Sequence, residues 1–261
     1  MSDLIQHAAD LLVRAQHAIV LTGAGISTPS GIPDFRSRDT GLWANYNPME
    51  TATIQVFRHR PDDFFNWIRP LARQMIEAQP NAAHRALAEL QHAGRLATII
   101  TQNIDGLHQR AGATDVVELH GTIYTATCVR CYHVFASEIF VNALIDRGQV
   151  PTCPDCGCIL KPNAILYGEA LPIPALMAAK RAAGRCDLMI VAGSSLEVSP
   201  ASDLPMIAVA RQAKLIIVNR DPIYMDQHAE VVIHDDLACV LPQIAEACLP
   251  AAQGESFGDN R

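Results

Sequence analysis

Short apolar runs that end in small or polar residues recur along most of the chain. They occupy residues 18–21, 96–100, 116–119, 187–191, 214–218 and 230–233, and stretches of helical periodicity separate several of them. Near-continuous apolar strands that alternate with helices are typical of a parallel sheet covered on both faces. This pattern predicts an α/β protein.

The composition limits the classes of partner. The chain has 261 residues, of which 49% are hydrophobic, so it has enough apolar material for one large domain or one domain with a small insert. Its formal net charge of −7 argues against nucleic acid as the chief ligand. No apolar run approaches the roughly 18–20 residues that span a bilayer, and the N-terminus does not resemble a signal peptide. We therefore expect a cytoplasmic protein that binds neither membranes nor nucleic acid.

Two segments interrupt the strand and helix pattern. Residues 26–95 are far longer than a crossover between parallel strands needs; loop-forming residues fill 31–41, and helical periodicity follows at 61–75 and 82–92. The aromatic residues of this insert are predicted to form its core rather than a base-stacking platform: Trp43, Phe57, Phe64, Phe65 and Trp67. The second interruption, residues 125–163, carries five of the eight cysteines and predicts a separate module.

The spacing of four cysteines predicts a structural zinc site. Cys128 and Cys131 form one C-x2-C pair, and Cys153 and Cys156 form a second pair after 21 intervening residues. Four thiolates complete a tetrahedral shell and leave no position for a reacting water. Cys158 is a fifth candidate, but the second pair is preferred because its spacing mirrors the first. His133 is not expected to bind the metal.

Ligand-type residues follow four of the predicted strands. Gly23, Ala24 and Gly25 form a glycine turn after the first, although Thr28 occupies the third glycine position of the usual dinucleotide fingerprint, so an ordinary turn stays an alternative. The other groups are Gln102, Asn103, Ile104 and Asp105; Gly193, Ser194 and Ser195; and Asn219. Because parallel strands end at one edge of the sheet, this convergence predicts a nucleotide-binding crevice.

Histidines divide into one candidate base and several without an expected role. His120 lies between a strand and a glycine turn, beside the polar strand ends, which favours catalysis over a structural role. Glu118 either orients His120 or is an exposed strand residue. The histidines on helical stretches are expected to be solvated or to cap helices: His7, His17, His84 and His92.

Several motifs in a fixed order resemble those of the sirtuins. They are Gly23-Ala24-Gly25-Ile26-Ser27, Gly31-Ile32-Pro33-Asp34-Phe35-Arg36, Thr101-Gln102-Asn103-Ile104-Asp105, Leu119-His120-Gly121, the two cysteine pairs, Tyr167-Gly168-Glu169 and Gly193-Ser194-Ser195-Leu196. The resemblance extends from about residue 15 to residue 242. It implies an NAD-dependent protein-lysine deacylase that transfers the acyl group to ADP-ribose, with release of nicotinamide and 2′-O-acyl-ADP-ribose.

The resemblance also implies a domain organisation. A Rossmann-like NAD-binding domain would comprise residues 1–36, 81–124 and 164–249. A small domain would combine a cofactor loop and helical insert at 37–80 with the zinc module at 125–163, and residues 250–261 would form a flexible tail. The substrates would be NAD and acyl-lysine proteins or peptides.

Site residues are implied in the same way. His120 would be the general base, with Asn103 beside it in the catalytic centre. The NAD-binding set would be Gly23, Ala24, Gly25, Thr28, Asp34, Phe35, Arg36, Gln102, Asn103, Ile104, Asp105, His120, Gly193, Ser194, Ser195, Asn219 and Leu237. The acyl-lysine peptide would bind against Leu166, Tyr167, Gly168, Glu169 and Val198.

Departures from the family pattern bear on the acyl group. Members that remove acidic acyl groups carry a Tyr-x-x-Arg pair, and an ungapped alignment places Phe65 and Ile68 at those positions, with Arg69 one residue out of register. Acetyl or longer apolar acyl groups are therefore predicted over succinyl. Alternative functions are mono-ADP-ribosyl transfer and a non-enzymatic zinc-bearing binding module.

Overall fold

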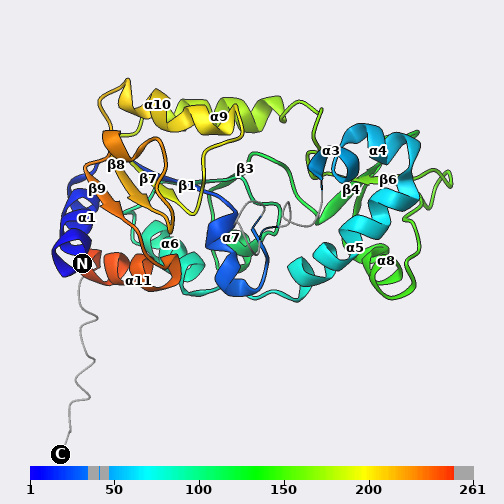
Figure 1. The fold of residues 1–261 in the computed structure, drawn as a ribbon, viewed down its shortest axis with the longest axis horizontal. Helices are drawn as coiled ribbons and strands as arrows, with labels where there is room; N and C mark the ends of the chain where they lie inside the picture. Colours follow the sequence, from blue (N-terminus) through cyan, green and yellow to red (C-terminus); the bar gives the residue numbers. More distant parts are fainter. Residues whose placement is uncertain (35–40, 42–46, 250–261) are drawn as a thin grey trace, which may run out of the picture.

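The computed structural model describes residues 1–34, 41 and 47–249. Its larger part is a six-stranded parallel sheet in the order β3-β2-β1-β7-β8-β9 (Figure 1). The strands are β1 (Ala18–Thr22), β2 (Thr98–Thr101), β3 (Val116–Glu118), β7 (Leu188–Ala192), β8 (Lys214–Val218) and β9 (Val231–Ile233). The predicted parallel α/β sheet is thus confirmed.

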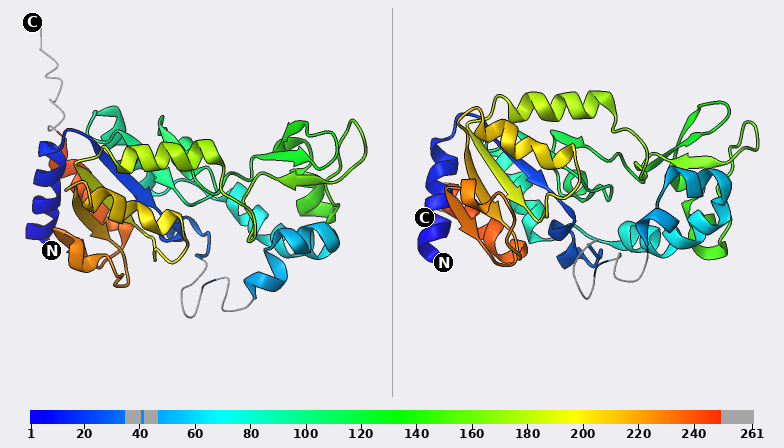
Figure 2. Two further views of the ribbon diagram at one scale, coloured as in Figure 1. Left: turned by 90° about the horizontal axis from the view of Figure 1, so that it is seen from above. Right: turned by 45° about the horizontal axis from the view of Figure 1, so that its top comes forward.

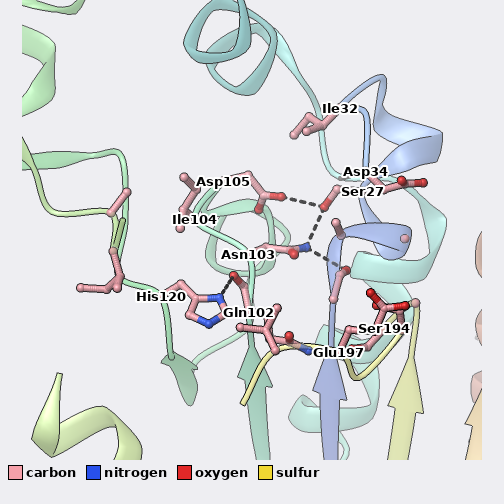
Figure 3. A pocket seen from close by; sticks show the side chains of 18 of the residues that line it. Ser27, Ile32, Asp34, Gln102, Asn103, Ile104, Asp105, His120, Ser194 and Glu197 are labelled. Atoms are coloured by element: carbon pink, nitrogen blue, oxygen red, sulfur yellow. Dashed lines mark hydrogen bonds between the residues drawn. The ribbon is translucent and has the colours of Figure 1, made fainter. Parts of the chain in front are cut away.

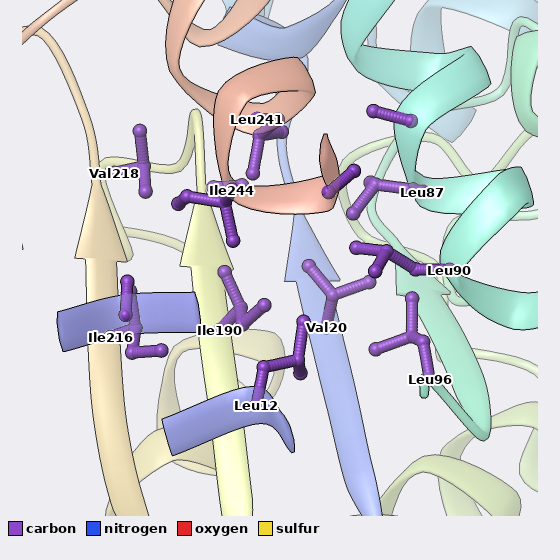
Figure 4. Close-up of a cluster of buried hydrophobic side chains, with 14 of the residues drawn as sticks. Leu12, Val20, Leu87, Leu90, Leu96, Ile190, Ile216, Val218, Leu241 and Ile244 are labelled. Carbon is purple, nitrogen blue, oxygen red and sulfur yellow. The ribbon is translucent and has the colours of Figure 1, made fainter. Parts of the chain in front are cut away.

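Helices cover both faces of this sheet. One face carries α1 (Ser2–Arg14), α6 (Ala82–His92) and α11 (Leu237–Cys248), and the other carries α9 (Ile173–Ala183) and α10 (Leu204–Val209). The short α7 (Leu107–Arg110) follows β2. Alternate residues of one strand serve the two faces. Val20 joins the cluster under α11 (Figure 4), whereas Ile19 and Leu21 join the cluster under α9. The central strands are therefore buried on both sides.

A smaller lobe lies beyond the end of the sheet that carries the strands' carboxyl termini (Figure 2). It contains the antiparallel strands β4 (Thr125–Cys128), β5 (Val134–Ala136) and β6 (Leu160–Pro162), together with α8 (Val141–Arg147). The helices α3 (Pro48–Thr51), α4 (Ile54–His59) and α5 (Pro61–Glu77) pack beside them. The zinc module and the helical insert, far apart in sequence, thus build one lobe.

Edge-to-face aromatic contacts hold the helical insert together. The ring centroid of Phe64 lies 5.4 Å from that of Phe57 and 5.2 Å from that of Phe65, and all three side chains are buried. Such pairs contribute roughly 0.5–1.5 kcal/mol beyond area burial. Trp67 is only partly buried, so the predicted aromatic core holds for the three phenylalanines, while Trp43 lies outside the described residues.

Connections between the elements include five 3-10 turns. They are η1 (Ala24–Ile26), η2 (Thr28–Ser30), η3 (Ser137–Ile139), η4 (Ala201–Asp203) and η5 (Asp226–His228). The predicted tail at 250–261 and the cofactor-loop residues Phe35 and Arg36 lie outside the described residues. The domain boundaries stay a prediction.

Candidate active site

A cleft opens at the carboxyl edge of the parallel sheet, facing the smaller lobe. Its volume is about 1430 Å³, more than the roughly 300–1,000 Å³ of a pocket for one small ligand. Every predicted NAD and peptide residue that the structure describes lines it: Gly23, Ala24, Gly25, Thr28, Asp34, Gln102, Asn103, Ile104, Asp105, His120, Leu166, Tyr167, Gly168, Glu169, Gly193, Ser194, Ser195, Val198, Asn219 and Leu237. The cleft can therefore hold a dinucleotide and an extended side chain together.

The turns after β1 and β7 touch so closely that side chains would not fit between them. A Cβ atom on Gly23 would lie 2.7 Å from the carbonyl oxygen of Gly193, and one on Gly25 would lie 2.9 Å from the Gly193 Cα. Gly193 itself has φ +66°, which favours glycine. These glycines thus let two strand-end turns pack together, and the Gly25 N–H donates to the Gly193 carbonyl at 2.9 Å.

Asn103 is the centre of a buried polar network (Figure 3). Its Nδ2 donates to the Gly23 carbonyl oxygen and to Ser27 Oγ, both at 3.1 Å. Ser27 Oγ in turn donates to Asp105 Oδ2 at 2.7 Å, and Asp105 Oδ1 accepts the Leu107 N–H at 3.0 Å. Both amide hydrogens of Asn103 are committed to the protein, so Oδ1 is the atom it can offer to a ligand. Ser27 was not singled out from sequence.

Burial of Asp105 changes its acidity. Desolvation raises the pKa of this carboxyl above its usual value, while the bonds from Leu107 and Ser27 oppose the shift. The side chain is only 3% exposed, yet its segment lines the cleft. Asp105 therefore anchors the turn that presents Ile104 to the cleft.

A backbone carbonyl fixes the tautomer of His120. Its Nδ1 lies 2.8 Å from the Gln102 carbonyl oxygen, which can only accept a hydrogen bond. Nδ1 therefore carries the proton, and Nε2 is the basic nitrogen of the neutral ring. The Gln102 carbonyl thus orients the ring. Glu118 is half-buried, and its pKa is raised chiefly by desolvation, which a hydrogen bond with Gln109 opposes.

The far end of the cleft is organised by Asn219 and Ser194. Asn219 Oδ1 accepts the Ser194 N–H at 3.0 Å, and its Nδ2 donates to the Ser194 carbonyl at 2.8 Å. Gln102 Nε2 donates to Ser194 Oγ at 2.7 Å. These bonds connect the ends of β2, β7 and β8, so the polar residues expected to meet there do so.

The loop at 164–169 forms the wall shared with the smaller lobe. The Tyr167 N–H donates to the Ala52 carbonyl, and the Ile54 N–H donates to the Tyr167 carbonyl, both at 3.0 Å. Glu169 Oε2 lies 2.9 Å from Lys161 Nζ and accepts the Leu166 N–H at 2.9 Å. Glu169 thus holds this loop in place through its ion pair with Lys161 of β6. The sequence did not indicate this contact.

The four cysteines of the predicted zinc site come together. Their sulfur atoms all lie within 4.8 Å of one another; Cys128 Sγ is 3.4 Å from Cys156 Sγ, and Cys131 Sγ is 3.6 Å from Cys153 Sγ. A disulfide would bring sulfurs to about 2.05 Å, whereas Zn–S bonds of about 2.3 Å in a tetrahedron place them at nearly 3.8 Å. The donor set fits zinc. Cys158 is not part of this cluster.

Two buried histidines lie behind the site. His84, predicted to be solvated or capping, is fully buried, and its Nδ1 accepts the Asn81 N–H at 3.4 Å, so capping is correct and solvation is wrong. Its ring centroid lies 4.9 Å from that of His108, whose Nε2 is 2.9 Å from Thr22 Oγ1. Burial lowers the pKa of His84 to about 4 and that of His108 well below 6.5.

Within residues 1–34, 41 and 47–249, no helix is long and apolar enough to cross a membrane.

Fold and site together define a class of protein: a nucleotide-binding enzyme whose cleft is shared between a doubly covered parallel sheet and a lobe with a four-cysteine metal site. The model of the Sir2 family matches residues 23–200. The chain belongs to the Sir2 family.

Similar proteins cover nearly the whole chain. NAD-dependent protein deacetylase 1 of Geobacillus kaustophilus is 45% identical over 85% of this chain and 89% of its own length. NAD-dependent protein deacylase 2 of Archaeoglobus fulgidus is 44% identical over 94% of this chain and 96% of its own length. A solved Sir2 complex with deacetylated p53 peptide and 3′-O-acetyl ADP ribose has a TM-score of 0.87 and 40% identity, covering 93% of this chain and 97% of that one.

Proposed function

We propose that His120 acts as the general base of an NAD-dependent protein-lysine deacylation that transfers the acyl group to ADP-ribose. The chain is an NAD-dependent protein deacylase of the Sir2 family. The observation that carries the residue assignment is the Gln102 carbonyl at His120 Nδ1, which makes Nε2 the proton acceptor. A neutral imidazole with one fixed tautomer can remove a proton near neutral pH without a large pKa shift.

NAD supplies an activated C1′ when nicotinamide leaves, and the protein supplies orientation. Asn103 would accept a hydrogen bond through Oδ1, because both of its amide hydrogens bond to Gly23 and Ser27. Ile104 and Asp105 would shape the nicotinamide pocket, and Ser194, Ser195, Asn219 and Leu237 would line the remaining length of the dinucleotide. Rigid positioning of this kind is worth several kcal/mol of the barrier.

An acyl-lysine protein or peptide would bind as a strand between Leu166–Glu169 and the segment around Val198. Both segments line the cleft, and the first is held by backbone bonds to Ala52 and Ile54 and by the Lys161–Glu169 ion pair. β-augmentation reads the backbone of the bound chain more than its side chains. We therefore propose loose sequence selectivity.

The acyl group would be acetyl or a longer apolar chain. Phe65 is 1% exposed within the aromatic cluster, and Ile68, Leu71 and Met75 line the cleft. Arg69, the nearest cation in sequence, lies beside Gly148. An acidic acyl group would find no guanidinium among these side chains, and its desolvation would be uncompensated. Comparable rates on succinyl and acetyl peptides would refute this assignment.

Zinc would have a structural role and the protein would work in a reducing compartment. The four clustered sulfurs would fill a tetrahedral shell, and crowded cysteines that ligate a metal instead of forming disulfides are typical of a reducing compartment such as the cytoplasm.

Mass spectrometry of an acetyl-lysine peptide, incubated with and without NAD, tests the proposal. Loss of acetyl only with NAD, with O-acetyl-ADP-ribose formed, is the expected result. The His120→Ala variant should lose deacylation, while His92→Ala on the exposed face of α6 should not. Transfer of ADP-ribose to protein that outpaces deacylation would instead establish the ribosyltransferase alternative.

A further inference from the structure

His234 connects the ends of two strands behind the far end of the cleft. It follows β9 directly, as Asn219 follows β8. His234 Nδ1 lies 3.1 Å from the Asn219 carbonyl oxygen, and His234 Nε2 lies 3.3 Å from Asp226 Oδ2 at the start of η5. The Asn219 N–H also donates to the Ile233 carbonyl at 3.1 Å. One imidazole thus contacts both η5 and the backbone of Asn219.

Both partners of this imidazole are hydrogen-bond acceptors. A carbonyl oxygen and a carboxylate oxygen carry no proton, so a neutral ring satisfies one of them and turns a lone pair toward the other. With Nδ1–H donated to Asn219, a bare Nε2 would face the Asp226 carboxylate at 3.3 Å. Only the doubly protonated ring donates to both. Both ring nitrogens therefore face acceptors.

Asp226 is held from two sides. Its Oδ1 is buried without a hydrogen-bond partner among the described residues, and its Oδ2 accepts the Ile223 N–H at 3.2 Å. The same Oδ2 contacts the His234 ring. The charged residues next to these groups in sequence are Asp235, Asp236 and Arg220, and the Arg220 guanidinium lies 3.8 Å from Asp236.

Asn219 links the His234 ring to the wall of the cleft. Its side chain holds Ser194 by two hydrogen bonds, and both residues line the cleft, whereas His234 does not. The segment that follows His234, at 235–237, also lines the cleft. A ring that donates to Asn219 therefore fixes two neighbouring stretches of the wall from behind.

We propose that His234 is a positioning residue for the dinucleotide: by joining Asp226 to Asn219 it sets the affinity of the cleft for the ADP-ribose portion of NAD. This inference rests on the proposed function. Chemistry at His120 is left untouched.

Calorimetric titration with ADP-ribose tests the inference without any catalytic step. The His234→Gln variant, whose single amide nitrogen can replace only one of the two ring nitrogens, should bind ADP-ribose roughly three- to tenfold more weakly than the wild type. His234→Arg keeps several donors, so it should retain affinity. His228→Gln, an exposed histidine on the same η5, is the matched control and should behave as the wild type.

Kinetics provide the second readout. In His234→Gln the KM for NAD should rise by a similar factor, while kcat at saturating NAD stays within about twofold, because the acyl-transfer residues are unchanged. Wild-type affinity for ADP-ribose in His234→Gln, or an equal loss of affinity in His234→Gln and His234→Arg, would overturn the inference alone. A wild-type protein that binds no ADP-ribose would overturn the proposed function and this inference with it.

Discussion

The buried pair His84 and His108 predicts a loss of stability in mild acid. In the folded protein the pKa of His84 is lowered from 6.5 to about 4, mainly by burial, and that of His108 is lowered as well. The unfolded chain therefore binds protons below pH 6.5 that the folded chain excludes. The stabilisation is fully present above the unfolded pKa and is lost as the pH falls.

The size of the effect follows from the two pKa values. With 6.5 unfolded and about 4 folded, proton linkage makes the His84 contribution fall by about 2 kcal/mol between pH 7 and pH 5. His84→Gln removes this contribution but keeps the cap, since Gln at the third helical position also reaches back to the N-cap N–H. Between pH 7 and pH 5, the free energy of unfolding of the variant should therefore fall by about 2 kcal/mol less than that of the wild type.

Urea unfolding of zinc-loaded protein at pH 7 and pH 5 measures this difference. His92→Gln, on the exposed face of the same helix, is the control and should keep the wild-type pH dependence. Buried acids such as Asp105, whose pKa is raised, change the free energy of unfolding in the opposite direction as the pH falls. They are present in all three proteins, so their contributions cancel in the comparison. Equal losses in the wild type and in His84→Gln would refute the reasoning.

Three further predictions concern the site and its framework. His120→Ala should lower the deacylation rate by roughly 10²–10⁴-fold yet still bind ADP-ribose in a calorimetric titration; retention of full activity would remove His120 as the base. Cys131→Ser should hold much less than one zinc per chain by elemental analysis and show a lower melting temperature, because structural zinc contributes folding energy directly; unchanged zinc content would contradict the four-cysteine site. Gly193→Ala should lower the free energy of unfolding by more than about 1 kcal/mol, because φ is +66° and the new Cβ would lie 2.5 Å from the Ile26 nitrogen; denaturant unfolding within about 0.3 kcal/mol of the wild type would refute this.

The strands and helices could be predicted from the spacing of apolar residues along the chain. The apolar run at 214–218 and the helical periodicity at 82–92 coincide with β8 and α6. Their periodicity reflects which face is buried, and that is a property of neighbouring residues. The convergence of four strand ends was also predictable, since parallel strands share one carboxyl edge.

Contacts between distant residues were not predictable in the same way. His84 looks like a helix-surface residue until α7 brings His108 against it, and Ser27 becomes part of the site only when the chain places it between Asn103 and Asp105. Lys161 and Glu169 similarly hold the loop at 164–169 through a pairing that no spacing rule encodes. The sequence gives the chemical type of each side chain, but only the fold shows which residue each side chain contacts.

The zinc module is tied to the turn that shapes the catalytic cleft. Immediately before β4, the Ile123 N–H donates to the Ile104 carbonyl at 3.2 Å, and the Tyr124 ring lies against Gly106, where a Cβ would come within 2.6 Å of Cε2. β4 itself ends at the zinc-site residue Cys128. Loss of the metal would therefore loosen β4 and the two preceding residues that contact the Ile104–Gly106 turn, so a zinc ion that performs no chemistry would still help to position Ile104 and Asp105.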